Sequence, residues 1–221
     1  MCAAKRKPSD DPLAVPAAVI GRLSLYLREL SHFVRAGNLT TNSDELSTRL
    51  GLSAAQVRKD LAYFGQFGRP GIGYRCEELI GAIRSILGTD RRWPVLLAGV
   101  GNLGRALLGY RGFVPQGFEI VAAVDVISEK VGTEVEGVRV EHLDGLAEIV
   151  RREGITVAIL AVPAGSAQAV ADRLVAAGVR GIVNFAPVTL SLPEETSLLG
   201  VDLAIQLEQV AFSVANRQLP R

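Results

Sequence analysis

The sequence predicts an α/β fold built on a doubly wound parallel β-sheet, preceded by a smaller helical domain. Three observations carry this prediction. A glycine-rich turn at 99–104 joins an apolar strand to a helix. Strands and helices alternate with short connections from 94 to 187, which is typical of a parallel sheet. Short helical segments joined by a glycine turn occupy 44–64 and form a separate local pattern.

Composition and charge are those of a folded protein with a basic first part. Of the 221 residues, 48% are hydrophobic and 21% charged, which suits one or two domains with a sizeable core. Residues 1–92 carry 14 Lys and Arg against 9 Asp and Glu, a balance of +5. Residues 93–221 carry 10 against 14, a balance of −4. This asymmetry fits a polyanionic partner for the first part, and it fits uneven surface charge equally well.

Cysteine usage and hydropathy indicate a soluble protein of the reducing cytoplasm. Cys2 and Cys76 are the only cysteines, so no disulfide framework or metal site can be built from them. No apolar run approaches the roughly 18 residues of a membrane span, and no signal-peptide pattern opens the chain. We therefore expect a cytoplasmic protein with no metal and no membrane partner.

The first 36 residues are predicted to form a flexible arm and a helix. Residues 1–16 hold three prolines and the basic triplet Lys5–Lys7, and a solvated tail explains this triplet better than DNA contact does. A helix is predicted for 17–36, because apolar residues from Ile20 to Val34 recur at spacings of three and four.

Residues 44–64 show a helix-turn-helix pattern, whose second helix enters the major groove of DNA in proteins that use it. A short helix is predicted at 44–50, and the turn 51–53 contains a glycine. Ser53 is placed to cap the second helix, predicted at 54–64.

The polar residues of this second helix are the candidate DNA contacts. Gln56, Arg58 and Lys59 lie early on it, where glutamine and arginine read base edges and lysine and arginine hold phosphates. The alternative for Arg58–Asp60 is a solvated charged face, but the preceding turn favours DNA binding. The side expected to be buried carries Ala55, Val57, Leu61 and Phe64.

The glycine-rich segment 65–74 resembles the β-hairpin wing of a winged-helix domain. Arg69 would lie at its tip and enter a narrow minor groove. A helix at 77–87 and the polar stretch 88–92 follow. We therefore predict a winged-helix DNA-binding domain at 17–90.

The turn at 99–104 has the spacing G-x-G-x-x-G and lies between a strand at 94–98 and a helix, as the dinucleotide fingerprint requires. Its glycines allow a tight turn, close approach of a pyrophosphate, and close packing of helix on strand. Asp125 ends the next strand, 119–124, and lies 125 − 104 = 21 residues past the last glycine, where a carboxylate binds the adenosine ribose. The alternative is a glycine-rich turn without a ligand.

Further strands are predicted at 137–141, 156–162 and 181–187, with a helix at 146–152 and another, capped by Ser166, that ends at Ala177. Ligands bind at the carboxyl ends of parallel strands, so the ends of the last two strands are candidates for the nicotinamide side. The expected cofactor-binding residues are Gly99, Val100, Gly101, Asn102, Leu103, Gly104, Asp125, Lys130, Val162, Pro163, Asn184, Phe185, Ala186 and Pro187.

A last helix is predicted at 203–216, with Leu203, Leu207, Val210 and Val214 on one stripe. It follows the last predicted strand after a long link. The sequence therefore allows this helix to pack on another subunit.

The two halves together resemble the Rex family of redox-sensing transcriptional repressors over nearly the whole chain. The segments that carry the resemblance are Gln56–Leu61, Tyr63–Gly65, Gly71–Tyr74, Gly99–Gly104 and Asn184–Pro187. The family often has Asp-x-Asp after the second Rossmann strand, whereas this chain has Asp125-Val-Ile127. Selection against the 2′-phosphate of NADP(H) is therefore expected to be weaker here.

The resemblance implies a homodimeric repressor that binds an inverted-repeat operator on double-stranded DNA and is released by NADH, while NAD⁺ competes without causing release. It implies a Rossmann NAD(H)-binding domain at 91–201 and a C-terminal helix at 202–221 that is exchanged between subunits. The switch residues implied by it are Arg28, Tyr110 and Asp202.

Two other classes of function stay open from the residues alone. A small NAD(P)-dependent oxidoreductase needs a catalytic acid or base, and only Lys130 and His142 among the lysines and histidines lie in the second domain. Neither of them ends a predicted crevice strand, and no length is left for a substrate domain. A CoA-binding or other nucleotide module would use the glycine turn and leave 40–75 without a function.

Overall fold

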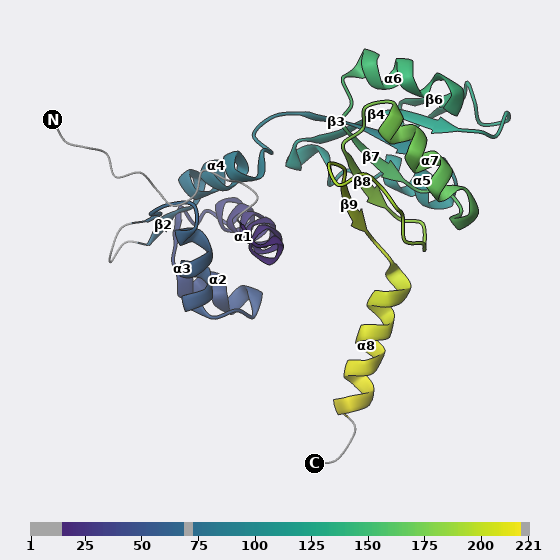
Figure 1. Cartoon of the computed structure of the whole chain (residues 1–221). Coiled ribbons are helices and arrows are strands. Elements are labelled where there is room, and N and C mark those ends of the chain that lie inside the picture. Colours follow the sequence, from purple (N-terminus) through teal and green to yellow (C-terminus); the bar gives the residue numbers. More distant parts are fainter. Residues whose placement is uncertain (1–14, 69–72, 218–221) are drawn as a thin grey trace. The chain divides into compact units, whose positions relative to one another are not determined.

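The computed structural model describes residues 15–68 and 73–217, and contacts between Cα atoms divide the chain into two compact units after Arg91 (Figure 1). Unit 1 covers 1–91 and unit 2 covers 92–221. Within the described ranges, no helix is long and apolar enough to cross a membrane.

In its described residues, unit 1 has four helices and one small antiparallel β-ladder. Its helices are α1 (Ala17–Arg35), α2 (Ser43–Leu50), α3 (Ala54–Ala62) and α4 (Cys76–Leu87), and its strands are β1 (Thr40–Thr41) and β2 (Tyr74–Arg75).

Local sequence signals explain where α2 and α3 begin. The Asn42 side chain accepts hydrogen bonds from the backbone N–H groups of Asp44 and Glu45, and the Ser53 side chain accepts one from Gln56. Gly51 ends α2 in the left-handed conformation, which costs glycine little. The helix-turn-helix arrangement is therefore present, although α3 ends two residues earlier than predicted.

The core of unit 1 is formed mainly by the apolar stripe of α1, which packs against the other helices. The largest fully buried side chains include Leu23, Tyr26 and Leu30 of α1 and Ile83 of α4. One predicted core position is wrong: Ala55 is exposed, because the buried side of α3 is formed by Val57, Asp60 and Leu61.

The expected wing is seen only in part. Strand β2 pairs with β1, so Tyr74 lies opposite Thr41, and β2 has no ladder partner within the described part of 65–74. Gly68 and Gly73 both have positive φ, and a Cβ on Gly68 would lie 2.6 Å from the Gly73 carbonyl oxygen. Gly68 and Gly73 therefore lie close together. Arg69, the expected tip of the wing, lies outside the described residues.

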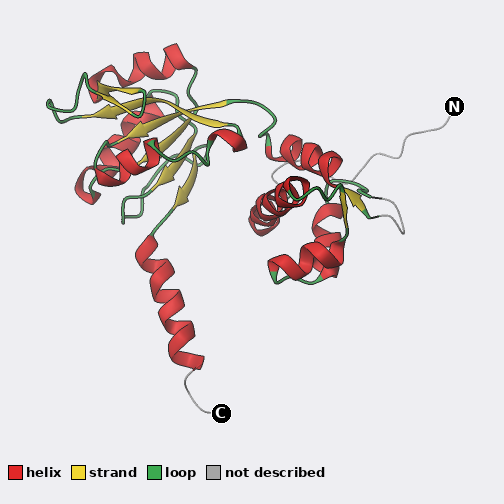
Figure 2. Cartoon of the chain, turned by 180° about the vertical axis from the view of Figure 1, so that it is seen from behind, coloured by secondary structure: helices red, strands yellow, loops and turns green. Residues whose placement is uncertain are grey.

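Unit 2 is a seven-stranded sheet flanked by helices (Figure 2). Its strands lie in the order β5-β6-β4-β3-β7-β8-β9, and every neighbouring pair is parallel except β5 with β6. The strands are β3 (Trp93–Ala98), β4 (Phe118–Asp125), β5 (Glu134–Val135), β6 (Val138–His142), β7 (Val157–Leu160), β8 (Gly181–Asn184) and β9 (Ser197–Gly200).

The strand order contains one reversal, and this reversal positions the site. The chain runs outward from β3 through β4 to β6, then returns to β7 on the other side of β3 and continues to β8 and β9. In such sheets the ligand crevice lies at the carboxyl ends of the strands on either side of the reversal. Those ends are Ala98 of β3 and Leu160 of β7.

Helices α5 (Asn102–Leu108), α6 (Leu146–Glu153) and α7 (Ala164–Ala176) cover the sheet. On one face Leu96 and Leu160 pack into a core with the inner sides of α6 and α7. On the other face Leu97 and Ile159 pack with Leu107 of α5. Alternate residues of each strand therefore point to opposite helical layers, as a strand buried on both sides requires.

Three expectations for unit 2 are wrong. The strand predicted at 181–187 is shorter, because β8 ends at Asn184. Helix α7 begins at Ala164 after Pro163, and the Ser166 hydroxyl donates to the Pro163 carbonyl at 3.0 Å, so Ser166 lies inside the helix and does not cap it. The predicted long link before the last helix contains the parallel edge strand β9, which has two exposed leucines and no alternation of buried residues.

The last helix, α8 (Leu203–Arg217), is exposed along its length. Leu207 and Phe212 retain 70% and 71% of their accessible surface. Leu203, Ile205, Val210 and Val214 are exposed as well. Apolar side chains so exposed on a helix mark a surface that another element covers.

Candidate functional site

The glycine turn forms a cradle whose first and last glycines are fixed by sterics. Gly99 has φ +97°, and a Cβ there would lie 2.5 Å from the Ala161 carbonyl oxygen of the β7–α7 connection. A Cβ on Gly104 would collide with the Gly99 carbonyl oxygen, so helix α5 packs directly on the turn. Around Gly101, the N-cap of α5, nothing lies within 4 Å of a Cβ position. The turn is therefore tight on its protein side and open where a phosphate binds.

Asp125 lies at the carboxyl end of β4 and accepts four hydrogen bonds. Its Oδ2 accepts from the Val100 backbone N–H at 2.8 Å and from Lys130 Nζ at 2.9 Å. Its Oδ1 accepts from the backbone N–H groups of Val126 at 2.8 Å and Ile127 at 3.0 Å. The carboxylate thereby connects the glycine turn to the loop after β4.

These contacts keep Asp125 ionised. Burial raises the pKa of the carboxyl, but the hydrogen bond and charge of Lys130 and the backbone donors Val100 and Ile127 outweigh burial and lower it. A carboxylate offers about four lone-pair directions, and all of them are occupied. A ribose hydroxyl that binds Asp125 must therefore displace one donor, and the Lys130 side chain is the only one of the four that is not backbone.

A cavity of about 280 Å³ lies between the glycine turn, Asp125 and the start of α7. Its walls are mostly apolar, and Asp125 and Lys130 are its only charged lining residues. This arrangement suits a flat apolar group joined to a sugar, such as the adenosine half of a dinucleotide. The lining includes the predicted residues Gly99, Gly101, Asp125, Lys130, Val162 and Pro163. It also includes Ile127, which the sequence placed near the ribose, and Leu143, Ser166 and Val170, which were not expected in the site.

The remaining predicted cofactor residues have different environments. Asn102 and Leu103 are exposed at the start of α5. Asn184 is buried, and its amide is fully engaged: Nδ2 donates to the carbonyls of Ala186 at 3.1 Å and Val188 at 3.0 Å, and Oδ1 accepts from the Ala186 N–H at 2.9 Å. Asn184 therefore shapes the turn after β8. The backbone of this turn is engaged as well: the Phe185 N–H donates to the Leu160 carbonyl at 2.9 Å, and the Asn184 carbonyl accepts from the Val201 N–H at 2.8 Å. Phe185 and Pro187 do not line the adenosine-sized cavity.

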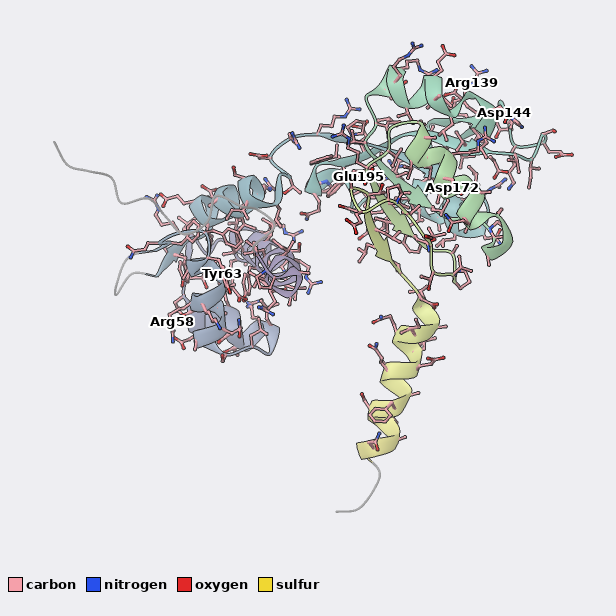
Figure 3. The ribbon with its side chains drawn as sticks, viewed as in Figure 1. Arg58, Tyr63, Arg139, Asp144, Asp172 and Glu195 are labelled. Atoms are coloured by element: carbon pink, nitrogen blue, oxygen red, sulfur yellow. The ribbon has the colours of Figure 1, made fainter. Side chains whose placement is uncertain are left out.

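The candidate DNA contacts lie together on the first turns of α3, where Figure 3 shows the Arg58 side chain extending from the helix. Arg58 Nη1 donates to Ser43 Oγ at 2.8 Å, which holds its exposed guanidinium toward the start of α2. Lys59 is exposed, and Ser53 caps the helix. Gln56 is half-buried, and its Nε2 donates to Asp60 Oδ1 at 2.7 Å.

Asp60 is the residue of this region whose role the sequence did not indicate. The triplet Arg58–Asp60 has the appearance of a solvated face, yet the Asp60 side chain has no exposed surface. Arg22 binds it with two nitrogens, Nη2 reaching Oδ1 at 2.9 Å, and the Tyr26 hydroxyl donates to Oδ2 at 2.7 Å. Burial raises the pKa of this carboxyl, and the hydrogen bonds from Arg22, Tyr26 and Gln56 outweigh burial and lower it.

The three expected switch residues lie in two different units. In unit 1 the Arg28 side chain is 58% exposed, with Nε 3.7 Å from Glu29. In unit 2 Tyr110 follows α5, is 58% exposed and packs edge-on against Phe113. Asp202 accepts the Ala204 N–H at 2.8 Å and so caps α8.

Comparisons with known proteins match both halves of the chain. Residues 14–62 match the family model described as "Putative DNA-binding protein N-terminus". Residues 90–188 match the family model described as "CoA binding domain".

Curated relatives named "Redox-sensing transcriptional repressor Rex" match almost end to end. The protein of Syntrophomonas wolfei is 46% identical over 201 residues, covering 91% of this chain and 96% of the relative. The protein of Rhodopirellula baltica is 46% identical over 205 residues, covering 93% and 86%. The protein of Streptomyces coelicolor is 42% identical over 206 residues, covering 93% and 80%.

Solved structures of RSP, a Rex-family repressor, have the same fold. The complex with β-NAD⁺ and operator DNA has a TM-score of 0.87 at 35% identity and covers 92% of this chain and 94% of RSP. The complex with β-NADH has a TM-score of 0.84 at 34% identity, covering 93% and 96%. Identity above 40% along nearly the whole length, together with this fold, shows that the chain belongs to the Rex family of redox-sensing transcriptional repressors.

Proposed function

We propose that this chain binds an inverted-repeat operator as a homodimer in the cytoplasm and leaves it when NADH binds. One observation carries the proposal: a helix-turn-helix with exposed Arg58 and Lys59 and a dinucleotide cradle at 99–104 occur in one chain. The relative RSP has been solved with operator DNA and with NADH. The two units are proposed to be a DNA-binding domain at 17–90 and a NAD(H)-binding domain at 91–201.

The cofactor is proposed to be NADH or NAD⁺, and selection against NADP(H) is assigned to Asp125. Its ionised carboxylate would accept hydrogen bonds from the adenosine ribose and repel a 2′-phosphate. Two features weaken this selection. Ile127 adds no second carboxylate, and Lys130, once displaced from Asp125, carries a positive charge beside the ribose position.

Dimerisation is proposed to use the C-terminal segment 202–221, which contains α8, as an exchanged element. In the single chain its apolar side chains are exposed over most of the helix circumference. Polar residues such as Gln209 and Ser213 form only a narrow strip along the helix. We propose that a second chain covers this apolar surface, because within unit 2 of the described chain these side chains remain exposed.

The switch is proposed to depend on one charge. NADH and NAD⁺ differ by the positive charge on the nicotinamide ring, and a ligand shifts an equilibrium only by its difference in affinity for the two states. With NAD⁺, Asp202 would stay near the ring and bind Tyr110. With NADH that attraction is lost, and Asp202 would pair with Arg28, closing the dimer into an arrangement that no longer matches the operator.

The DNA-binding part of the proposal is tested by selection of duplexes from a random pool with the full-length chain. We expect an inverted repeat whose half-sites lie about one helical turn, or a multiple, apart. Recovery of no preferred sequence would contradict it.

Calorimetry with NADH, NADPH and CoA tests the nucleotide site. CoA is included because residues 90–188 match a family model described as a CoA binding domain. Binding of CoA in preference to NADH would contradict the cofactor assignment.

A further inference from the structure

Asp60 is a buried carboxylate that joins helix α1 to the DNA-facing helix α3. Each of its oxygens accepts two hydrogen bonds: Oδ1 from Arg22 Nη2 and Gln56 Nε2, and Oδ2 from Arg22 Nε and the Tyr26 hydroxyl. Its side chain has no exposed surface, whereas the Arg22 side chain is 23% exposed. All four lone-pair directions of the carboxylate are therefore used, and its orientation is fixed from α1.

The orientation of the Gln56 amide follows from this. An ionised carboxylate only accepts hydrogen bonds, so Gln56 must turn its NH₂ group, and not its carbonyl, toward Asp60. The bond of 2.7 Å between Gln56 Nε2 and Asp60 Oδ1 uses one of the two amide hydrogens. The Gln56 carbonyl oxygen and the second amide hydrogen make no other hydrogen bond within the described chain. Gln56 thus presents one acceptor and one donor, side by side, from the first turn of α3.

That pair is complementary to one base. Adenine presents an acceptor, N7, and a donor, the N6 amino group, in the major groove, and glutamine binds both at once. Gln56 is half-buried and lies two residues before Arg58, on the turn of the helix that contacts base edges in helix-turn-helix proteins. A side chain already held in one orientation loses less conformational freedom when it binds.

We propose that Asp60, held by Arg22 and Tyr26, is a positioning residue that fixes the Gln56 amide for reading adenine at one position of each half-site. This inference rests on the proposed DNA-binding function. Gln56 would then determine base specificity at that position. Helix α1, through Arg22 and Tyr26, would fix the orientation of Gln56 without contacting a base itself.

The test is duplex selection from a random pool with full-length parent, Gln56→Ala and Asp60→Asn. The parent should prefer adenine at one half-site position by on the order of 5- to 150-fold, the range for a bidentate base contact. Gln56→Ala should lose that preference and keep the others. Asp60→Asn should weaken the same preference, and the double variant should match Gln56→Ala at that position, since Asp60 acts there only through Gln56.

The control is Gln168→Ala, which breaks a matched bond on helix α7 of unit 2. Gln168 Nε2 donates to Asp172 Oδ1 at 2.7 Å with the same spacing of four residues, and Gln168 also exchanges two hydrogen bonds of 2.9 Å with the Ser191 backbone. This variant should leave every base preference unchanged. The slope of affinity against salt should also stay unchanged in Gln56→Ala, because no phosphate contact is lost.

Several results would overturn the inference. One is an unchanged preference profile in Gln56→Ala. Another is uniform loss of affinity in folded Asp60→Asn without a change of profile, which is what a merely structural role produces. If circular dichroism shows that Asp60→Asn is unfolded, Tyr26→Phe is the test variant in its place. It removes one hydrogen-bond donor to the Asp60 carboxylate and should reduce the preference for adenine. An unchanged base-preference profile in Tyr26→Phe would refute the inference. A parent that selects no sequence overturns the proposed function as well, whereas a parent with a clear preference that survives in Gln56→Ala overturns only this inference.

Discussion

Replacement of Asp125 by asparagine separates the two roles of this carboxylate in unit 2. The side chains of Asp125 and Lys130 are 7% and 21% exposed, and their ion pair spans 2.9 Å. The asparagine side chain in Asp125→Asn would face Lys130 with an uncharged group. Its amide would also be a poorer hydrogen-bond acceptor for the Val100 N–H than the carboxylate is. Leaving a mostly buried donor unsatisfied costs about 1–3 kcal/mol, so unit 2 should remain folded with a lower melting temperature.

The effect on cofactor binding should be larger for NADH than for NADPH. A hydrogen bond to a charged group contributes about 1.5–3 kcal/mol, so loss of one ribose bond weakens NADH binding roughly 10- to 150-fold. NADPH loses the same bond but also loses the repulsion of its 2′-phosphate, so its affinity should change little. Calorimetry of both ligands with parent and Asp125→Asn gives the four constants. Equal affinities for NADH and NADPH in the parent, or an equal loss of both in the variant, would refute the assigned role.

Three further predictions concern DNA, dimerisation and pH. Arg58→Ala should weaken operator binding by about 1–3 kcal/mol and relax the sequence preference at one base pair, whereas Lys59→Ala should reduce the slope of log affinity against log salt concentration by about one. If both variants behave like the parent in mobility-shift assays, α3 is not the helix that contacts the operator bases. Leu207→Asp should shift the dimer to monomer in analytical ultracentrifugation, because burying a leucine that is 70% exposed stabilises a dimer by about 1–2 kcal/mol. The control Gln209→Asp, on the polar strip of α8, should leave the dimer intact. Because the pKa of Asp60 is lowered in the folded protein, its ionised carboxylate adds stability that is complete above the unfolded pKa of about 4 and is lost as the pH falls through the folded pKa. The difference in urea stability between parent and Asp60→Asn should therefore be constant above about pH 5 and shrink below about pH 4. A difference that does not change with pH contradicts this.

Local patterns in the sequence predicted the geometry of the glycine turn and of Asp125 beside it. The turn Gly99–Gly104 and the acid Asp125 follow from a fixed spacing, because the βαβ unit brings the end of the second strand back beside the first turn. The alternation of strands and helices likewise predicted the parallel sheet, and the overall fold is confirmed by the match to Rex structures.

Features that depend on distant residues were not predictable in the same way. The role of Asp60 was not indicated by the sequence, since its partners Arg22 and Tyr26 lie 38 and 34 residues earlier in the chain. Strand β9 was missed because an edge strand with exposed residues has no buried periodicity. Ser166 has the identity of a cap, but Pro163 sets the start of α7 and places Ser166 within its first turn.

The implied switch uses residues from both units. Arg28 lies in unit 1, and Tyr110 and Asp202 lie in unit 2, so their pairing stays a proposal. Arg28→Ala and Asp202→Ala should still bind NADH in calorimetry and should remain on the operator when NADH is added. Release of either variant at the same NADH occupancy as the parent would remove that residue from the switch.

The most direct measurement of the central claim is fluorescence anisotropy of a labelled operator duplex, obtained by selection, during titration of the bound full-length protein with NADH and separately with NAD⁺. We expect NADH to release the DNA and NAD⁺ not to release it, while added NAD⁺ raises the NADH concentration needed for half release. Release by both ligands at equal occupancy, or by neither, would contradict it.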